Sequence, residues 1–215
     1  MGLCDEAIRL GRVLTELMPD EPEASGLLAL MLLHHARRAA RVDGASALVP
    51  LEKQDRGLWD GDAIAKATTL LDAALRRGQA GQYQLQAAIA ACHATATDAR
   101  STNWREIAQL YGRLSRLLPT PVVALNRAVA VAMADGPAAG LELVDRLERS
   151  GDLAGYHLLP ATRADLLRRL GRQPEAADAY RTAIELAPTD AERHYLTRRL
   201  AETARDASVR RATTD

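Results

Sequence analysis

The sequence predicts an all-α fold of stacked antiparallel helical hairpins, and three observations support this. Apolar residues recur with the helical period along almost the whole chain, without the alternating β-branched and aromatic runs typical of strands. Aromatic residues are only 3% of the chain and phenylalanine does not occur, so Ala, Leu and Val must build the core. Part of the sequence also repeats with a period of about 35 residues. Small core side chains and such a repeat favour helices packed closely in successive hairpins.

Ten helices are expected from the periodicity. They span about residues 3–18, 22–41, 60–77, 81–97, 103–118, 121–134, 137–150, 156–171, 174–187 and 190–206. Proline, which cannot continue a helix, follows three of these ends, at Pro19, Pro119 and Pro188. Glycine stands where a C-terminal cap needs a positive φ angle, at Gly78, Gly136 and Gly171. Side chains suited to N-caps are those of Asp20, Asp60, Thr120 and Asp190.

Two tyrosines and two prolines show the repeat most clearly. Tyr111 and Tyr180 are 69 residues apart, as are Pro119 and Pro188, which corresponds to two repeats of about 34–35 residues. In the second copy, the small, aromatic and proline positions are Ala164, Gly171, Ala176, Tyr180, Ala183 and Pro188. This pattern resembles the tetratricopeptide repeat (TPR), whose hairpins stack into a right-handed superhelix with a concave face. The repeats are clearest over about residues 103–190.

The domain organisation expected from this pattern is a single TPR-like helical domain over residues 1–215. It contains one long irregular loop, at about residues 42–59, and a C-terminal tail, 207–215, that we expect to be disordered. The first helix repeats the Glu-Ala and proline spacing of the clearest copy, so it corresponds to the second helix of a hairpin. The chain is therefore expected to be the C-terminal piece of a longer protein.

Composition narrows the class of protein. Basic and acidic residues balance at 28 each, which gives no overall attraction to nucleic acid or to an anionic membrane. The two cysteines, Cys4 and Cys92, form neither a disulfide framework nor a metal-binding spacing. No apolar run is long enough to span a membrane, and no signal-peptide pattern follows Met1. We therefore expect a cytoplasmic protein that binds neither membrane nor nucleic acid directly.

The long loop contains the segment LEKQDRGLWDG, residues 51–61, which is dense in functional groups. Its charged and amide residues are Glu52, Lys53, Gln54, Asp55 and Arg56, and they lie beside Leu51, Leu58 and Trp59. The apolar side chains need burial, and charges that follow them inward must be paired. We therefore expect the loop to fold back into a groove, anchored by Trp59, with Asp55 and Arg56 in fixed ion pairs. A disordered linker and a direct partner-binding site are the alternatives.

Two further groups of polar residues are candidates for anchoring this loop. Arg37, Arg38 and Arg41 form either a solvated helix face or partners for Glu52, Asp55 and Asp60, while Arg56 pairs with an acid or with free carbonyls. Residues 83–95 are poor in charge, and Gln86 and His93 share one face, so this helix must be covered. Asn126 and Arg127 occupy a similar position in the next hairpin.

Catalytic and metal-binding patterns are missing from the sequence. His34 and His35 are adjacent and point to different sides of a helix, and Cys92 and His93 cannot face each other. Neither a nucleophile elbow nor a glycine-rich phosphate loop occurs. We expect no enzyme activity, metal or cofactor, and instead an interaction module whose groove binds a peptide or helix.

Several segments in order carry a more specific resemblance. They are ALMLLHHARRAARVD, LEKQDRGLWD, YQLQAAIAACHA, PVVALNRAVAVAMADGPAAGL and YHLLPATRADLLRRLGR. From Leu3 to about Ala204 the chain resembles the C-terminal extension of extracytoplasmic-function (ECF) sigma factors that carry TPR-like repeats.

The resemblance implies that the complete protein is a bacterial transcription initiation factor whose promoter-binding and polymerase-binding regions lie upstream. This chain would be its regulatory protein–protein interaction domain. Its partners would be the upstream sigma-factor domains, the RNA polymerase core or a regulatory protein. The alternative is a free-standing TPR-like scaffold, or a sensor whose groove binds a small ligand or peptide.

Overall fold

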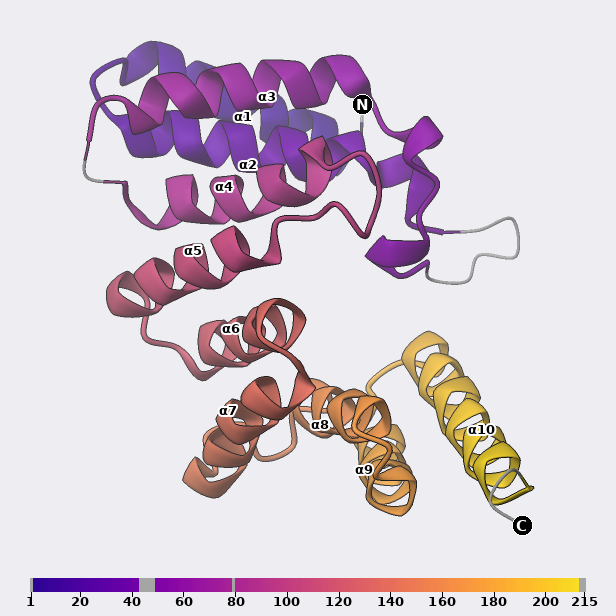
Figure 1. Ribbon diagram of the computed structural model, residues 1–215. Coiled ribbons are helices and arrows are strands. Elements are labelled where there is room, and N and C mark those ends of the chain that lie inside the picture. Colours follow the sequence, from indigo (N-terminus) through magenta and orange to yellow (C-terminus); the bar gives the residue numbers. More distant parts are fainter. Residues whose placement is uncertain (1, 43–48, 79, 213–215) are drawn as a thin grey trace. The chain divides into compact units, whose positions relative to one another are not determined.

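The computed structural model describes residues 2–42, 49–78 and 80–212, the last seven of these as helix backbone only. The regular secondary structure of this part is helical, and no strand occurs there (Figure 1). The helices are α1 Leu3–Leu17, α2 Pro22–Ala36, α3 Gly61–Leu75, α4 Gln82–Thr95, α5 Trp104–Leu117, α6 Pro121–Ala134, α7 Pro137–Ser150, α8 Leu158–Arg169, α9 Gln173–Leu186 and α10 Asp190–Ala212. Short 3₁₀ helices are η1 Arg38–Ala40, η2 Leu51–Lys53 and η3 Arg56–Leu58. The all-α prediction is confirmed for the described residues.

The predicted helix ends agree with the structure where local capping decides them. Asp60 and Thr120 accept hydrogen bonds from the backbone N–H of Ala63 and Val123, as N-caps do. Gly78, Gly136 and Gly171 all have positive φ angles, as predicted. Two caps were predicted one residue away from the residue that makes the bond. Glu21 rather than Asp20 caps α2, and the Thr189 hydroxyl accepts from Glu192 at the start of α10.

The C-terminal ends of two helices, α2 and α10, differ most from those predicted. The segment expected to be helical to residue 41 leaves the α-helical conformation after Ala36, because the Ala36 carbonyl accepts from the backbone N–H of Asp60 at 2.9 Å. That carbonyl would otherwise accept from Ala40, whose N–H donates to Arg37 in η1 instead. At the other end, α10 continues to Ala212, through most of the tail expected to be disordered. The tail contains Ala and Arg, which have high helix propensity.

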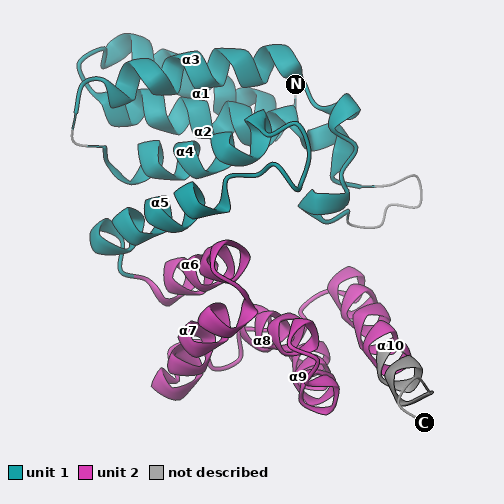
Figure 2. Ribbon diagram, viewed as in Figure 1, with its two compact units in different colours: residues 1–119 teal, residues 120–215 magenta. Residues whose placement is uncertain are grey.

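The chain divides into two compact units (Figure 2). Unit 1 comprises residues 1–119, and α2 is its centre because it packs against α1, α3 and α4. Helix α4 also packs against α3 and α5, which confirms that its charge-poor surface is covered. The fully buried residues of this core include Ala29, Leu33, Ala67 and Ala87. Small side chains at these positions permit the close approach of α2, α3 and α4.

Unit 2 comprises residues 120–215, and in its described part each helix packs against its neighbours along the chain. The small repeat positions Ala164, Ala176 and Ala183 are completely buried, and Tyr180 is only 2% exposed. These four repeat positions therefore belong to the core, together with Val144 and Leu167, whereas the repeat position Pro188 is exposed. No helix in the described residues of either unit is both long and apolar enough to cross a membrane.

Candidate functional site

The described part of the long loop, residues 49–60, is tied to the ends of α2 and α4. The Arg56 guanidinium donates to the carbonyl oxygens of His93 and Ala96, both at 2.8 Å. These carbonyls belong to the C-terminal end of α4, where a cation is favourable because backbone acceptors are left without intrahelical partners. The expectation that Arg56 finds free carbonyls is confirmed. These ties argue against the linker alternative for residues 49–60; residues 43–48 of the predicted loop lie outside the described part.

Trp59 is buried, as predicted, with 8% of its surface exposed. Two guanidinium groups lie over its ring, with the central carbon of Arg56 at 4.4 Å and that of Arg37 at 5.8 Å from the ring centroid. Aromatic rings attract cations at such distances. Two like charges therefore share one ring, which offsets part of the cost of placing them close together.

The predicted ion pairs of the loop do not form in the described part of the chain. Asp55 is exposed, and its Oδ1 accepts from the backbone N–H of Gly57 at 2.8 Å, so it caps η3 rather than pairing with an arginine. Because the backbone N–H of Gly57 already donates to this carboxylate, no arginine side chain has to be ordered beside it. The prediction that Leu58 is buried is also wrong, because 54% of its surface is exposed.

The arginines at the end of α2 make different contacts from those predicted. Arg37 and Arg41 approach Nδ1 of His34 at 3.3 and 3.4 Å, and Arg41 also donates to the His34 carbonyl at 3.0 Å. Neither forms an ion pair with Glu52, Asp55 or Asp60. Because arginine only donates, Nδ1 of His34 must accept, which places the proton of the neutral ring on Nε2. Both arginines thus contact His34, and Arg37 contacts the loop only through the face of the Trp59 ring.

A cavity of about 180 Å³ lies between α2, α4 and α5 in unit 1. We call it the central pocket, and its lining residues are Leu30, His34, Arg37, Gln86, Ile89, Ala90, His93 and Tyr111. Gln86 and His93 line the same cavity, so the prediction that they share one face is confirmed. His93 also contacts the edge of Trp104, with ring centroids 5.1 Å apart.

The electrostatics of the central pocket are dominated by arginine. Burial lowers the pKa of Arg37, and the positive charges of Arg41 and Arg56 lower it further. Burial, followed by the charges of Arg37 and Arg56, lowers the pKa of His93 to about 4. The His34 pKa is lowered by desolvation of its ring and by Arg37 and Arg41, although the residue is exposed on one side. At neutral pH the pocket therefore presents a cation and neutral imidazoles.

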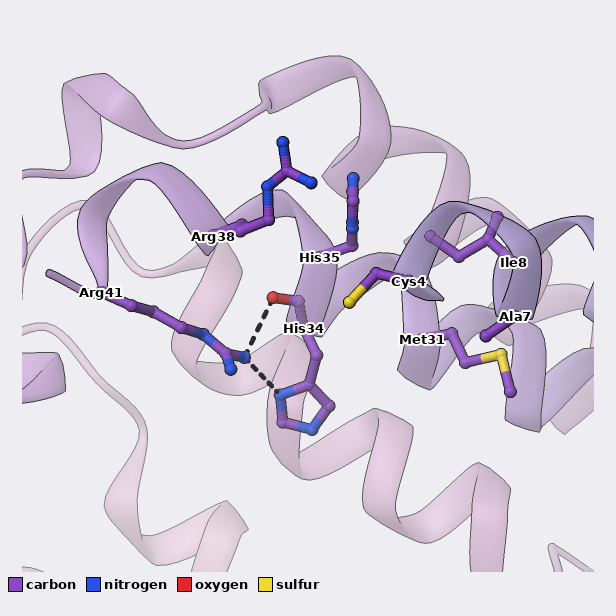
Figure 3. Close-up of a pocket in the computed structure, with 8 residues that line it drawn as sticks. All are labelled: Cys4, Ala7, Ile8, Met31, His34, His35, Arg38 and Arg41. Carbon is purple, nitrogen blue, oxygen red and sulfur yellow. Dashed lines mark hydrogen bonds between the residues drawn. The ribbon is translucent and has the colours of Figure 1, made fainter. Parts of the chain in front are cut away.

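A second cavity, of about 170 Å³, lies between α1 and the end of α2 (Figure 3). Its wall is mainly apolar and includes Ala7, Ile8 and Met31. Cys4 of α1 also lines this cavity (Figure 3). Arg38 is exposed at this cavity, and His35 approaches Asp5 at 3.7 Å. No residue of the described part of the long loop lines this cavity.

The remaining predicted site residues do not line the central pocket. Glu52 and Lys53 are exposed, and the Gln54 amide donates to the Val49 carbonyl at 3.1 Å within the loop. Asn126 and Arg127 are exposed on α6, in unit 2. Tyr111, by contrast, was identified only as a repeat position, and its spacing to Gln86 and His93 gave no sign that it would meet them.

The metal-ligating groups and the Cys92 thiol in the described part of the chain bear on the sequence-based expectations. No group of three or more His, Cys, Asp and Glu side chains there is placed to hold a metal ion. Burial and the nearby Glu106 raise the pKa of the Cys92 thiol to about 11, so it is protonated at neutral pH and a poor nucleophile.

Comparison with known proteins gives two similarities. Residues 1–75 match a family model described as a family of unknown function (DUF6596), a segment that covers α1 to α3 with Arg37 and Trp59 and stops before α4. An uncharacterized protein of Rhizobium meliloti (strain 1021) is 50% identical over 194 residues, which are 90% of this chain and 45% of that protein. The chain therefore spans less than half the length of this relative. No solved structure matches the chain.

Proposed function

We propose that this chain is the regulatory protein–protein interaction domain of a bacterial ECF sigma factor, with TPR-like hairpins in a right-handed superhelix. The observation that carries the proposal is an apolar stripe on α1. Leu3, Leu10 and Leu17 are 88%, 53% and 76% exposed, and their spacing of seven residues places them on one helix face. An exposed apolar face of this kind supports the proposal of a protein-interaction surface.

The partner proposed for the α1 stripe is the upstream part of the same protein. Two observations support it: the ordered motifs resemble the sigma-factor extension, and the Rhizobium meliloti relative has more than half of its length outside the match. Each leucine buried against a partner is worth about 1.5–3 kcal/mol relative to exposure. Contacts of this size suffice to shift a sigma factor between conformations that bind polymerase differently.

Two further features fit a regulatory part that leaves DNA to other domains. The balanced charge releases few counterions on a phosphate backbone, so direct DNA binding by this chain is not proposed. The buried small residues of unit 2 resemble the packing of TPR arrays, which bind proteins on extended surfaces. Transcription initiation would then be controlled through contacts with sigma domains, the RNA polymerase core or a separate regulator.

The test uses the full-length protein in its native host. Induction of the wild-type gene should change a defined set of transcripts measured by RNA sequencing, and the Leu10→Glu/Leu17→Glu double variant should change that response several-fold. Arg12→Glu alters an exposed residue elsewhere on α1 and is the matched control. No transcript response to the wild-type protein would refute the sigma-factor role. A normal response from a normally melting double variant would remove the α1 stripe from the mechanism.

A second candidate is a free-standing TPR-like scaffold or a sensor of a small ligand or peptide. The observation that favours it is the central pocket, in which an arginine faces apolar walls. The native reading frame separates the two candidates, since sigma-like helices encoded upstream of Leu3 support the first and their absence supports the second.

A further inference from the structure

Arg37 carries a positive charge that the described part of the chain does not neutralise. Its guanidinium approaches His34 and the face of Trp59, and neither is an anion. Arginine has five N–H donors, of which one has a partner here. The positive charges of Arg41 and Arg56 repel it. An anion placed beside Arg37 would relieve both the repulsion and the unmet hydrogen-bonding capacity.

The walls of the central pocket indicate what kind of anion fits. Leu30, Ile89 and Ala90 supply an apolar surface, while Gln86 and Tyr111 supply polar groups. Burial raises the pKa of Tyr111, so its hydroxyl stays protonated and can donate. A ligand that satisfies both surfaces has a planar anionic head and a short apolar body.

The size of the cavity limits the ligand further. Its volume is about 180 Å³, and one water-sized group occupies roughly 30 Å³ in a liquid. The pocket therefore takes on the order of six non-hydrogen atoms. A guanidinium matches a carboxylate through two parallel hydrogen bonds. A phosphate carries more charge than the single lining arginine would neutralise.

We propose that the central pocket binds a small organic carboxylate of about butyrate size, with its head on Arg37 and its hydrocarbon body against Leu30 and Ile89. This site is independent of the sigma-factor role, because binding by the chain alone tests it. A carboxylate bound here lies beside Arg37, which contacts Trp59, and beside His93, which contacts Trp104. Both tryptophans of the chain therefore report occupancy.

The experiment is a titration of the chain with sodium butyrate, followed by tryptophan fluorescence and calorimetry. For a ligand of about six heavy atoms we expect a saturable signal with a Kd of roughly 1 mM or tighter. Butyramide, which has the same shape without the charge, should bind at least tenfold more weakly. Sodium chloride at equal ionic strength controls for screening, and sodium phosphate tests the competing anion. A tighter Kd for phosphate than for butyrate would overturn the carboxylate assignment.

Matched variants decide which residue binds. Arg37→Gln should weaken butyrate binding at least tenfold, and Arg37→Lys should give an intermediate Kd because the charge remains but the fork is lost. Arg12→Gln removes an exposed arginine of the same unit outside the pocket and should bind as the wild type does. Since Arg37 also contacts Trp59, Gln86→Leu provides a second variant that leaves the loop contacts intact, and it should weaken binding several-fold. Unchanged binding in both Arg37→Gln and Gln86→Leu would refute the site.

Discussion

The two units bury their cores in different ways. In unit 2 each helix is covered by its neighbours along the chain, and the repeat positions Ala164, Ala176 and Ala183 are the fully buried ones. In unit 1 the central helix α2 packs on three others, and a loop brings Trp59 into the core. The repeat pattern is clearest over about residues 103–190, which include α5 of unit 1 as well as most of unit 2, and it is weak before residue 103. The part of the chain in which the repeat is weak is the part whose helices pack around α2 and whose core receives Trp59 from the loop.

The largest effect on stability is expected from substitution of Trp59, and it should fall on unit 1 only. Trp59→Ala should lower the free energy of unfolding of unit 1 by about 3–5 kcal/mol, because the ring is almost fully buried. Chemical denaturation followed by Trp104 fluorescence reports unit 1, and far-UV circular dichroism reports both units. The neighbouring Leu58→Ala is the control, and because Leu58 is exposed it should cost about 0.5 kcal/mol or less. Equal losses from the two variants would mean that the loop has no anchor.

Acid should destabilise unit 1 through His93. The ordinary histidine pKa of 6.5 falls to about 4 in the folded state, so between these values the unfolded chain binds more protons. Stability is therefore complete above about pH 6.5 and is lost as the pH falls towards 4, by about 3 kcal/mol at most. Unfolding of the wild type and of His93→Gln across this range measures the effect. His194→Gln, at an exposed histidine of unit 2, should keep the wild-type slope.

Glycines at helix crossings offer a matched comparison of the two cores. A Cβ on Gly26 would lie 2.8 Å from the backbone nitrogen of Gln84, and one on Gly140 would lie 2.8 Å from the Ala128 carbonyl. Gly26→Ala and Gly140→Ala should each cost about 1–2 kcal/mol, because overpacking outweighs the gain in helix propensity. Gly112→Ala in α5 meets nothing within 4 Å and should stabilise by up to about 1 kcal/mol. Thermal unfolding distinguishes these signs, and stabilisation by all three would contradict the close crossings.

The same contrast explains which features sequence reasoning could find. Helix ends were predictable where a local signal sets them, as at Thr120 and Gly136. The end of α2 was not, because it depends on a hydrogen bond between Ala36 and Asp60 across a long loop. Burial of Trp59 followed from its size alone, whatever surrounds it.

The partners of charged side chains were less predictable. The expectation of ion pairs for Asp55, Arg37 and Arg41 assumed that opposite charges in one segment meet. The structure satisfies them instead with a backbone N–H and with a histidine acceptor. Tyr111 reaches the central pocket only because α5 packs on α4, a contact that neither helix's own periodicity reveals.

A small effect on stability is expected at Asp55. Asp55→Ala removes one hydrogen bond, to the Gly57 backbone, at an exposed position without an ion pair in the described part of the chain. It should cost about 0.5–1 kcal/mol, as the loss of an N-cap does. Thermal unfolding measures this cost against that of Trp59→Ala. A loss of several kcal/mol would instead require a buried arginine left without its partner.

Because Asp55 contributes little to stability, a substitution there can distinguish a loop with only a structural role from a loop that contacts a partner. In the native-host assay, Asp55→Lys in the full-length protein reverses a charge without removing buried area. Lost transcript control with retained melting would make the loop a contact surface. Normal control with normal melting would leave Trp59 and Arg56 as anchors only. Loss of both would contradict the local role of Asp55, since an exposed capping carboxylate has too little free energy to unfold the unit.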